Sequence, residues 1–203
     1  MGVQERRARD KELLRRKIID AAAQLIVANG YEAFSLRQVA DKIEYSASSI
    51  YLYFKNKEEL LEAICAETFE ELIARMDRLE ARDLPPLECF EEGIREYINF
   101  GLQHPQHYEL VFSCPPGEND GTPLSRSKGL QAFGTLVRAF ERCAAAGIFR
   151  SSTPQQDVMV TWMAMHGITT ILITDYGKWD LPWSPMGDLI EHGVRMVSHG
   201  LRK

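Results

Sequence analysis

The stretch SLRQVADKIEYSASSIYLYFKNKEEL, residues 35–60, carries the helix-start signals that decide the fold. Ser35 precedes a short run with helical apolar spacing, and Gln38 stands where its side chain can reach back to the backbone N–H of the capping residue. Ser46 is placed to cap a second short helix, and Asn56 to open a longer third one. Two short helices joined by a brief turn predict a helix-turn-helix, whose second helix offers its first residues to a major groove.

The charge of the chain is unevenly distributed around this stretch. The formal net charge of the 203 residues is −5, which argues against a protein that coats nucleic acid indiscriminately. Residues 1–57 hold eleven Lys and Arg against seven Asp and Glu, or +4, whereas the remainder holds thirteen against twenty-two, or −9. The positive field therefore lies on the helix-turn-helix end.

Hydropathy and cysteine spacing argue against several classes of protein. No apolar run approaches the roughly 20 residues of a membrane span, and the N-terminus is charged rather than signal-like, so we expect a cytoplasmic protein with no membrane partner. Cys65, Cys89, Cys114 and Cys143 are far apart and form no CxxC pair. They predict buried or idle thiols rather than a zinc site or a disulfide framework.

A basic run over residues 2–17 leads into an amphipathic helix that Asn29-Gly30 ends with residues suited to a left-handed cap. Beside a helix-turn-helix, such an arm has a partner in the phosphate backbone. The alternative is a solvated, fraying terminus.

Spaced blocks of this region resemble the DNA-binding domain of the TetR family of bacterial transcriptional repressors. The blocks agree in order and in gap length: Asn29-Gly30-Tyr31, residues 35–40, residues 46–54 and residues 55–60. The chain departs from the family at Ser48, where the recognition helix commonly has glycine. The resemblance implies an all-α protein. Residues 1–56 would form a three-helix DNA-binding domain with a basic N-terminal arm, and residues 57–203 a helical ligand-binding and dimerisation domain of about six helices.

The resemblance also implies roles for individual residues. Small side chains in the first turn of the recognition helix would face the groove floor, where hydroxyls read donors or acceptors and Ala47 suits a thymine methyl. Arg37 would add a phosphate or guanine contact. Tyrosines would contact phosphates, although each could instead be a half-buried core ring. The expected DNA-binding residues are Ser35, Arg37, Ser46, Ala47, Ser48, Ser49, Tyr51, Tyr53 and Lys57.

Beyond residue 57 the apolar residues continue to recur at helical spacing. One long helix to about residue 82 would be a lever between the two parts of the protein, and an inward face with Leu130, Phe133 and Phe140 is expected in a later helix. The last two helices, from about residue 154 onward, are expected to form a homodimer interface as in the family. A two-fold dimer predicts a near-palindromic double-stranded DNA operator.

A regulator of this build needs an effector cavity among the helices of residues 60–176. Without converging basic residues, an uncharged or weakly polar small organic molecule is expected, with the loop at residues 113–123 as an entrance. Release of DNA by the effector is usual in the family. The expected lining residues are Phe69, Tyr97, Tyr108, Phe112, Phe133, Trp162, Met165 and His166.

The segment from Trp162 to Gly167 further resembles a Trp…His-Gly signature of one TetR subgroup. Trp162 and His166 lie four residues apart and share a helix face, and Gly167 would let another helix approach closely. His166 would be a polar group in an apolar pocket, or else a core histidine bonded to a carbonyl.

Other functional classes find less support. The sequence has no Gly-rich phosphate loop, no GxSxG and no zinc-spaced histidine pair on one helix, so no catalytic residue, metal ligand or cofactor is expected. A purely structural helical dimer would not need the basic entrance or Lys57. A DNA-binding regulator that has no small-molecule ligand and answers to a protein partner remains an alternative.

Overall fold

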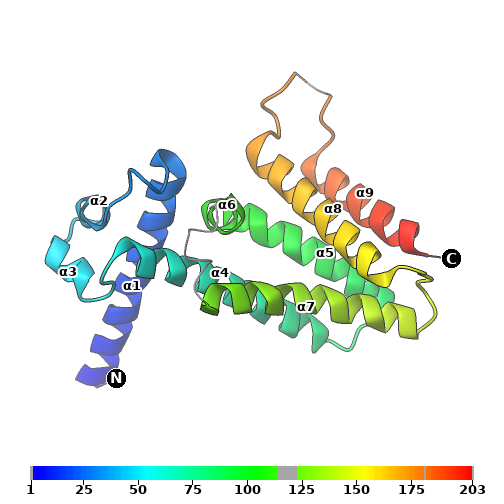
Figure 1. Cartoon of the computed structure of the whole chain (residues 1–203), viewed down its shortest axis with the longest axis horizontal. Helices are drawn as coiled ribbons and strands as arrows, with labels where there is room; N and C mark the ends of the chain where they lie inside the picture. Colours follow the sequence, from blue (N-terminus) through cyan, green and yellow to red (C-terminus); the bar gives the residue numbers. More distant parts are fainter. Residues whose placement is uncertain (1, 114–122, 181, 203) are drawn as a thin grey trace. The chain divides into compact units, whose positions relative to one another are not determined.

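The computed structural model describes residues 2–113, 123–180 and 182–202, and this part of the chain is all helical, with no strand (Figure 1). The prediction of an all-α protein is thereby confirmed. The helices are α1 (Val3–Asn29), α2 (Leu36–Lys42), α3 (Ala47–Tyr51), α4 (Lys57–Glu80), α5 (Pro86–Gln103), α6 (Pro105–Ser113), α7 (Pro123–Ala145), α8 (Pro154–Thr174) and α9 (Met186–Leu201).

The predicted caps define the starts of α2, α3 and α4. The Ser35 hydroxyl accepts a hydrogen bond from the Gln38 backbone N–H at 3.3 Å, and Ser46 does the same for Ser49 at 3.2 Å. The Asn56 side chain accepts from the Glu59 N–H at 2.7 Å. The Gln38 carboxamide differs from the prediction, because it accepts from the Ser35 hydroxyl at 3.0 Å rather than from a backbone N–H.

The basic N-terminal run is part of a helix. Helix α1 begins at Val3, and residues 4–13 are exposed turns of it. Gly30 ends the helix with a φ of 81°, a backbone conformation that side chains with a Cβ rarely adopt. The predicted arm is therefore a helical extension rather than a separate segment.

The chain divides into two compact units. One comprises Met1–Thr68 and Gln106–Arg126, and the other Phe69–Pro105 and Ser127–Lys203. The division falls within α4, so this helix contributes to both units. The functional boundary after residue 56 stays a prediction.

The core of the first unit is formed by the apolar faces of its helices. Ile18 of α1, Val39 of α2, Ile50 of α3 and Leu60 of α4 are completely buried in one core. Each buried aliphatic side chain of this size contributes about 1.5–3 kcal/mol relative to exposure. This shared core fixes the two short helices α2 and α3 in the first unit.

Helix α5 is central to the second unit. It packs against α8 and α9, and Phe90 of α5 meets Phe149 edge to face at 4.9 Å between ring centroids. The Arg95 guanidinium donates two hydrogen bonds to the Glu191 carboxylate of α9, at 2.7 and 2.9 Å. This bidentate pairing lowers the pKa of Glu191 and raises the pKa of Arg95.

Helix α7 corrects one prediction about the core. Phe140 is buried as expected, but Leu130 is 67% exposed, so its assignment to the inward face is wrong. Helical spacing alone does not tell which turns of a helix a neighbour covers. Residues 114–122, most of the predicted entrance loop, lie outside the described residues.

Helix α8 is apolar on several sides. With 21 residues and a mean hydropathy of 1.2, it is the one described helix long and apolar enough to cross a membrane, which corrects the expectation that no apolar run approaches that length. Core helices of soluble proteins can have the same length and composition. Several of its large side chains are exposed, namely Met159, Val160, Met163 and Ile171. Methionine, glycine and isoleucine at positions 163, 167 and 171 form a stripe at helical spacing.

Candidate functional site

The recognition helix α3 is anchored by its apolar residues and exposes its polar ones. Ile50 is completely buried and Phe54, just beyond the helix, is 2% exposed, whereas Ser46 and Ser48 are exposed. Ala47 and Ser49 are half-buried, and the hydroxyls of Ser46 and Ser49 lie 2.8 Å apart in a hydrogen bond. Ser48 is therefore the most available hydroxyl of the expected contact residues in this turn.

The two tyrosines of this segment differ in environment. Tyr51 is 56% exposed, which fits a hydroxyl directed at a phosphate. Tyr53 is half-buried, and its ring packs against the core of the first unit. The alternative of a half-buried ring thus describes the position of Tyr53 and not that of Tyr51.

Lys57 begins α4 beside the ring of Tyr31. Its ammonium nitrogen lies 4.4 Å from the Tyr31 ring centroid, a cation–π contact. The Tyr31 hydroxyl in turn donates to a Glu58 carboxylate oxygen at 3.4 Å. The ring therefore contacts a lysine at the N-terminus of a 24-residue helix, where backbone amides already favour an anion.

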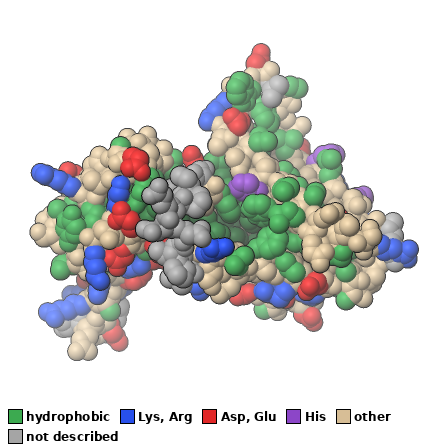
Figure 2. Space-filling model, viewed as in Figure 1, with side chains coloured by type: hydrophobic (Ala, Val, Ile, Leu, Met, Phe, Trp, Pro, Cys, Tyr) green, Lys and Arg blue, Asp and Glu red, His purple; other side chains and the backbone are tan. Residues whose placement is uncertain are grey.

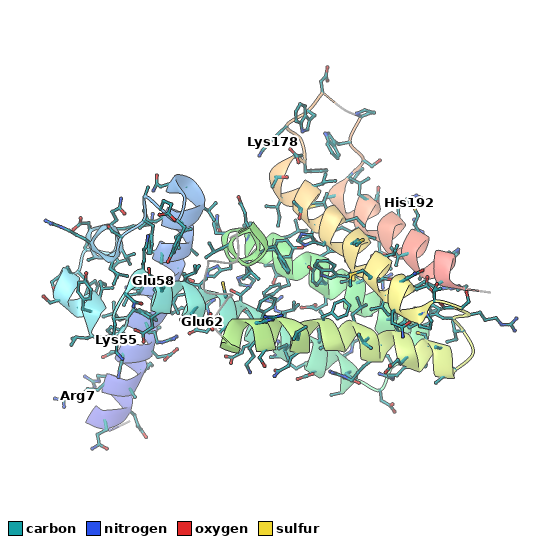
Figure 3. All side chains as sticks on the ribbon, in the orientation of Figure 1. Arg7, Lys55, Glu58, Glu62, Lys178 and His192 are labelled. Atoms are coloured by element: carbon teal, nitrogen blue, oxygen red, sulfur yellow. The ribbon has the colours of Figure 1, made fainter. Side chains whose placement is uncertain are left out.

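Residues 45–57 contain no acidic residue, and Lys55 and Lys57 supply positive charge at their end. Figure 3 labels Lys55 together with Glu58 of α4 in this unit. Ser35 and Arg37, at the start of α2, are exposed. Hydroxyls, a guanidinium and ammonium groups are the donors that proteins use on phosphates and base edges. The site can bind a polyanion and present small polar groups to it.

The sequence reasoning missed Leu52, which is 83% exposed, the highest value among large hydrophobic side chains of the described residues. The available signal was its position next to Tyr51, between the buried residues Ile50 and Phe54.

A second cluster joins three helices of the other unit. Trp162 and His166 of α8 stack with centroids 5.4 Å apart and planes 16° apart, as their spacing predicts. Phe133 of α7 meets Trp162 edge to face at 6.4 Å, and the Tyr97 hydroxyl of α5 lies 3.4 Å from His166 Nδ1. We call Tyr97, Phe133, Trp162 and His166 the aromatic cluster.

Burial controls the chemistry of this cluster. Desolvation lowers the pKa of His166, so the neutral imidazole is favoured. Tyr97 is 5% exposed, and Met165 beside the cluster is 4% exposed. Figure 2 shows hydrophobic side chains gathered on this unit where α5, α7 and α8 lie. The cluster thus combines aromatic rings with a neutral imidazole, groups whose chemistry suits contact with an uncharged organic molecule.

The remaining expected lining residues are placed elsewhere. Tyr108 and Phe112 of α6 belong to the first unit, where their rings lie 4.8 Å apart. Phe69 packs on α7 so closely that a Cβ at Gly129 would be 3.3 Å from its ring. Six of the expected residues therefore belong to the second unit, namely Phe69, Tyr97, Phe133, Trp162, Met165 and His166. Direct contacts join four of them, the residues of the aromatic cluster.

The His, Cys, Asp and Glu side chains in the parts of the chain that the structure describes are the candidates for metal binding and thiol chemistry. There, no group of three or more His, Cys, Asp and Glu side chains could hold a metal ion. Cys89 and Cys143 are buried free thiols, and burial raises the pKa of Cys143 to about 11. Such a thiol is a poor nucleophile at neutral pH. Cys114 lies outside the described residues.

Comparison with known families identifies both regions. Residues 18–64 match the family model of bacterial regulatory proteins of the tetR family. Residues 90–197, more than half of the chain, match the tetracyclin repressor-like C-terminal domain.

The curated relatives are similar over smaller parts. The fatty acid metabolism regulator protein of Bacillus subtilis is 39% identical over 61 residues, 30% of this chain and 31% of that protein. The nicotine-responsive transcriptional repressor HdnoR of Paenarthrobacter nicotinovorans is 35% identical over 65 residues, 32% of this chain and 34% of that protein. An HTH-type transcriptional regulator of Mycobacterium tuberculosis is 25% identical over 143 residues, 68% of this chain and 58% of that protein.

Solved structures share the fold over nearly the whole chain. A Rhodococcus protein of unknown function has a TM-score of 0.76 at 22% identity, covering 94% of this chain and 96% of that one. The fatty acid degradation regulator FadR from Bacillus halodurans has a TM-score of 0.73 at 17% identity, covering 93% and 94%.

Proposed function

The chain belongs to the TetR family of bacterial regulatory proteins, and we propose from this that it is a cytoplasmic repressor released from DNA by a small, largely apolar ligand. It would bind a near-palindromic operator as a homodimer. The observation that carries the proposal is the capped helix-turn-helix, whose stretch 45–57 contains no acidic residue and exposes Ser46, Ser48 and Tyr51. The expected DNA contacts are those predicted from the sequence, with Lys57 and Tyr51 on phosphates and Ser48 at base edges.

The proposed dimer uses α8 and α9. These helices expose large apolar side chains, among them Met163 at 56% and Met196 at 65%. A Cβ at Gly167, between Met163 and Ile171, would meet no described atom within 4 Å outside its own helix. Glycine in a helix interior costs about 0.5–1 kcal/mol relative to alanine, so its presence there favours a close approach by a helix of a second copy.

The proposed effector site is the aromatic cluster. Its rings offer stacking surfaces, and His166 with Tyr97 offers a polar contact. The names of two relatives refer to fatty acid metabolism and to nicotine, but those relatives align over only 30% and 32% of this chain. Their names therefore support an organic effector without identifying it.

Release of DNA requires that the ligand have different affinities for two forms of the protein. A ligand that binds the DNA-competent and the incompetent forms equally shifts nothing, however tightly it binds. The proposed ligand must bind the incompetent form better.

Selection of duplexes from a random pool, together with gel shifts on DNA from around the protein's own gene, tests DNA binding. We expect saturable binding to a near-palindrome that weakens steeply with salt. Absence of such binding on every selected duplex would refute the proposal.

A thermal-shift screen of small organic molecules tests the effector. A ligand of the native state raises the unfolding midpoint by mass action. We expect Trp162→Leu to remove that rise and Trp179→Leu, at a tryptophan 62% exposed outside the cluster, to retain it. If no molecule raises the unfolding midpoint or releases DNA, the alternative of a regulator controlled by a protein partner is favoured.

A further inference from the structure

Leu52 is an apolar side chain directed away from the core on the proposed DNA-facing surface. Burying a leucine side chain is worth about 1.5–3 kcal/mol, and Leu52, 83% exposed, gains little of this within its own chain. Single exposed leucines are common, so exposure alone assigns no role. The surroundings of Leu52 are what give its position meaning.

Those surroundings fit nucleic acid. Leu52 ends α3 in helical geometry, with φ −73° and ψ −18°, so Ser48 four residues earlier lies on the same exposed face. Tyr51 beside it is 56% exposed, and residues 45–57 contain no acid. An apolar group on a helix that also exposes the Ser48 and Tyr51 hydroxyls suits a polyanion that carries isolated methyl groups.

The major groove of DNA offers such a group. Among the base edges there, only thymine presents a methyl, at C5. Side chains four residues apart on a helix have Cβ atoms about 6 Å apart, which corresponds to roughly two base steps of about 3.4 Å.

We propose that Leu52 contacts a thymine methyl in each operator half-site, about two base pairs from the base that Ser48 meets, and so sets a sequence preference. The inference rests on the proposed function, because it needs α3 to enter the major groove. It adds a base-reading residue to a recognition helix whose expected base contacts are otherwise serines and an alanine.

Replacing single thymines by deoxyuridine tests the contact, because this change removes only the C5 methyl. The operator is a duplex selected by the wild-type protein, and wild-type and Leu52→Ala proteins are titrated against the same series. Burial of one methyl-sized group corresponds to about a fourfold change in affinity. We expect one thymine per half-site at which deoxyuridine lowers wild-type affinity about fourfold and leaves the affinity of Leu52→Ala unchanged.

The controls separate this contact from other effects. Leu130→Ala removes a leucine that is 67% exposed on α7, and it should keep the wild-type response to every deoxyuridine. Thermal denaturation of Leu52→Ala should match the wild type, because the side chain is exposed.

The possible results are distinct. Equal responses of wild type and Leu52→Ala at every thymine would overturn the inference while leaving DNA binding intact. A Leu52→Ala protein that binds DNA normally but loses self-association would overturn it in favour of a protein contact. Failure of the wild type to bind any selected duplex would refute the proposed function, and the inference with it.

Discussion

Substitution of Lys57 by alanine should reduce the salt dependence of DNA binding by a calculable amount. Each lysine–phosphate contact contributes about 0.9 to the slope of log affinity against log salt. Between 50 and 200 mM salt, a slope of 0.9 amounts to about 3.5-fold in affinity, or about 12-fold for the two copies in the proposed dimer. The affinity loss should be similar on all sequences, because a phosphate carries no base identity.

The same substitution also removes a contact within the protein. Lys57 Nζ lies 4.4 Å from the Tyr31 ring centroid, and an exposed cation–π contact is worth about 0.5–1 kcal/mol. The free energy of unfolding should therefore fall by about this amount in Lys57→Ala. Tyr31→Leu is the matched control, because it removes the ring and leaves the charge.

Fluorescence anisotropy across a salt series and chemical denaturation measure the two effects separately. We expect Lys57→Ala to lose both slope and stability, and Tyr31→Leu to lose stability alone. An unchanged slope in Lys57→Ala, or a change only in which sequence is preferred, would refute the assignment of Lys57 to a phosphate.

Three further substitutions test the second unit. Gly167→Leu should convert the dimer to monomers in sedimentation velocity while Gly134→Leu on α7 leaves it dimeric; a dimeric Gly167→Leu would argue against the α8 stripe as the interface. Because burial raises the pKa of Cys143 to about 11, the folded thiol keeps a proton that the unfolded thiol loses from about pH 9. The free energy of unfolding should therefore fall by roughly 2–3 kcal/mol as pH rises from 9 to 11. Denaturation under reducing conditions should show that Cys143→Ala lacks this part of the pH dependence. The lowered pKa of His166 means that the unfolded chain binds a proton first on acidification, so stability should fall as pH drops through about 6.5, and His166→Gln should lack this loss.

The local features of the helix-turn-helix could be predicted because short-range chemistry determines them. Ser35, Ser46 and Asn56 each cap a helix within three residues of their own position, and a cap needs no distant partner. Ile50 and Phe54 are buried where helical spacing places them. Even here the detail of Gln38 differs, since its carboxamide meets a hydroxyl instead of a backbone N–H.

Contacts between segments far apart in the chain were harder to predict from the sequence. The stacking of Trp162 on His166 follows from their four-residue spacing, but the approach of Tyr97 and Phe133 depends on how α5 and α7 pack on α8. Leu130 has the spacing of a core residue but is 67% exposed, whereas its neighbour Gly129 faces the Phe69 ring. Exposure of Leu52 likewise depends on which face of a very short helix the core takes.

Helix α4 is the element through which an effector could act on DNA binding. Its first turns carry Lys57 and bury Leu60 in the core of the first unit, whereas its later turns belong to the second. There Arg75 is tied to α5, donating to Glu96 at 3.2 Å and to Gln103 at 2.8 Å. A ligand that changes the packing of α5 must therefore either break these hydrogen bonds or displace α4 with it. For the proposed regulator, coupling requires only that two states of the protein differ in their affinities for both DNA and ligand.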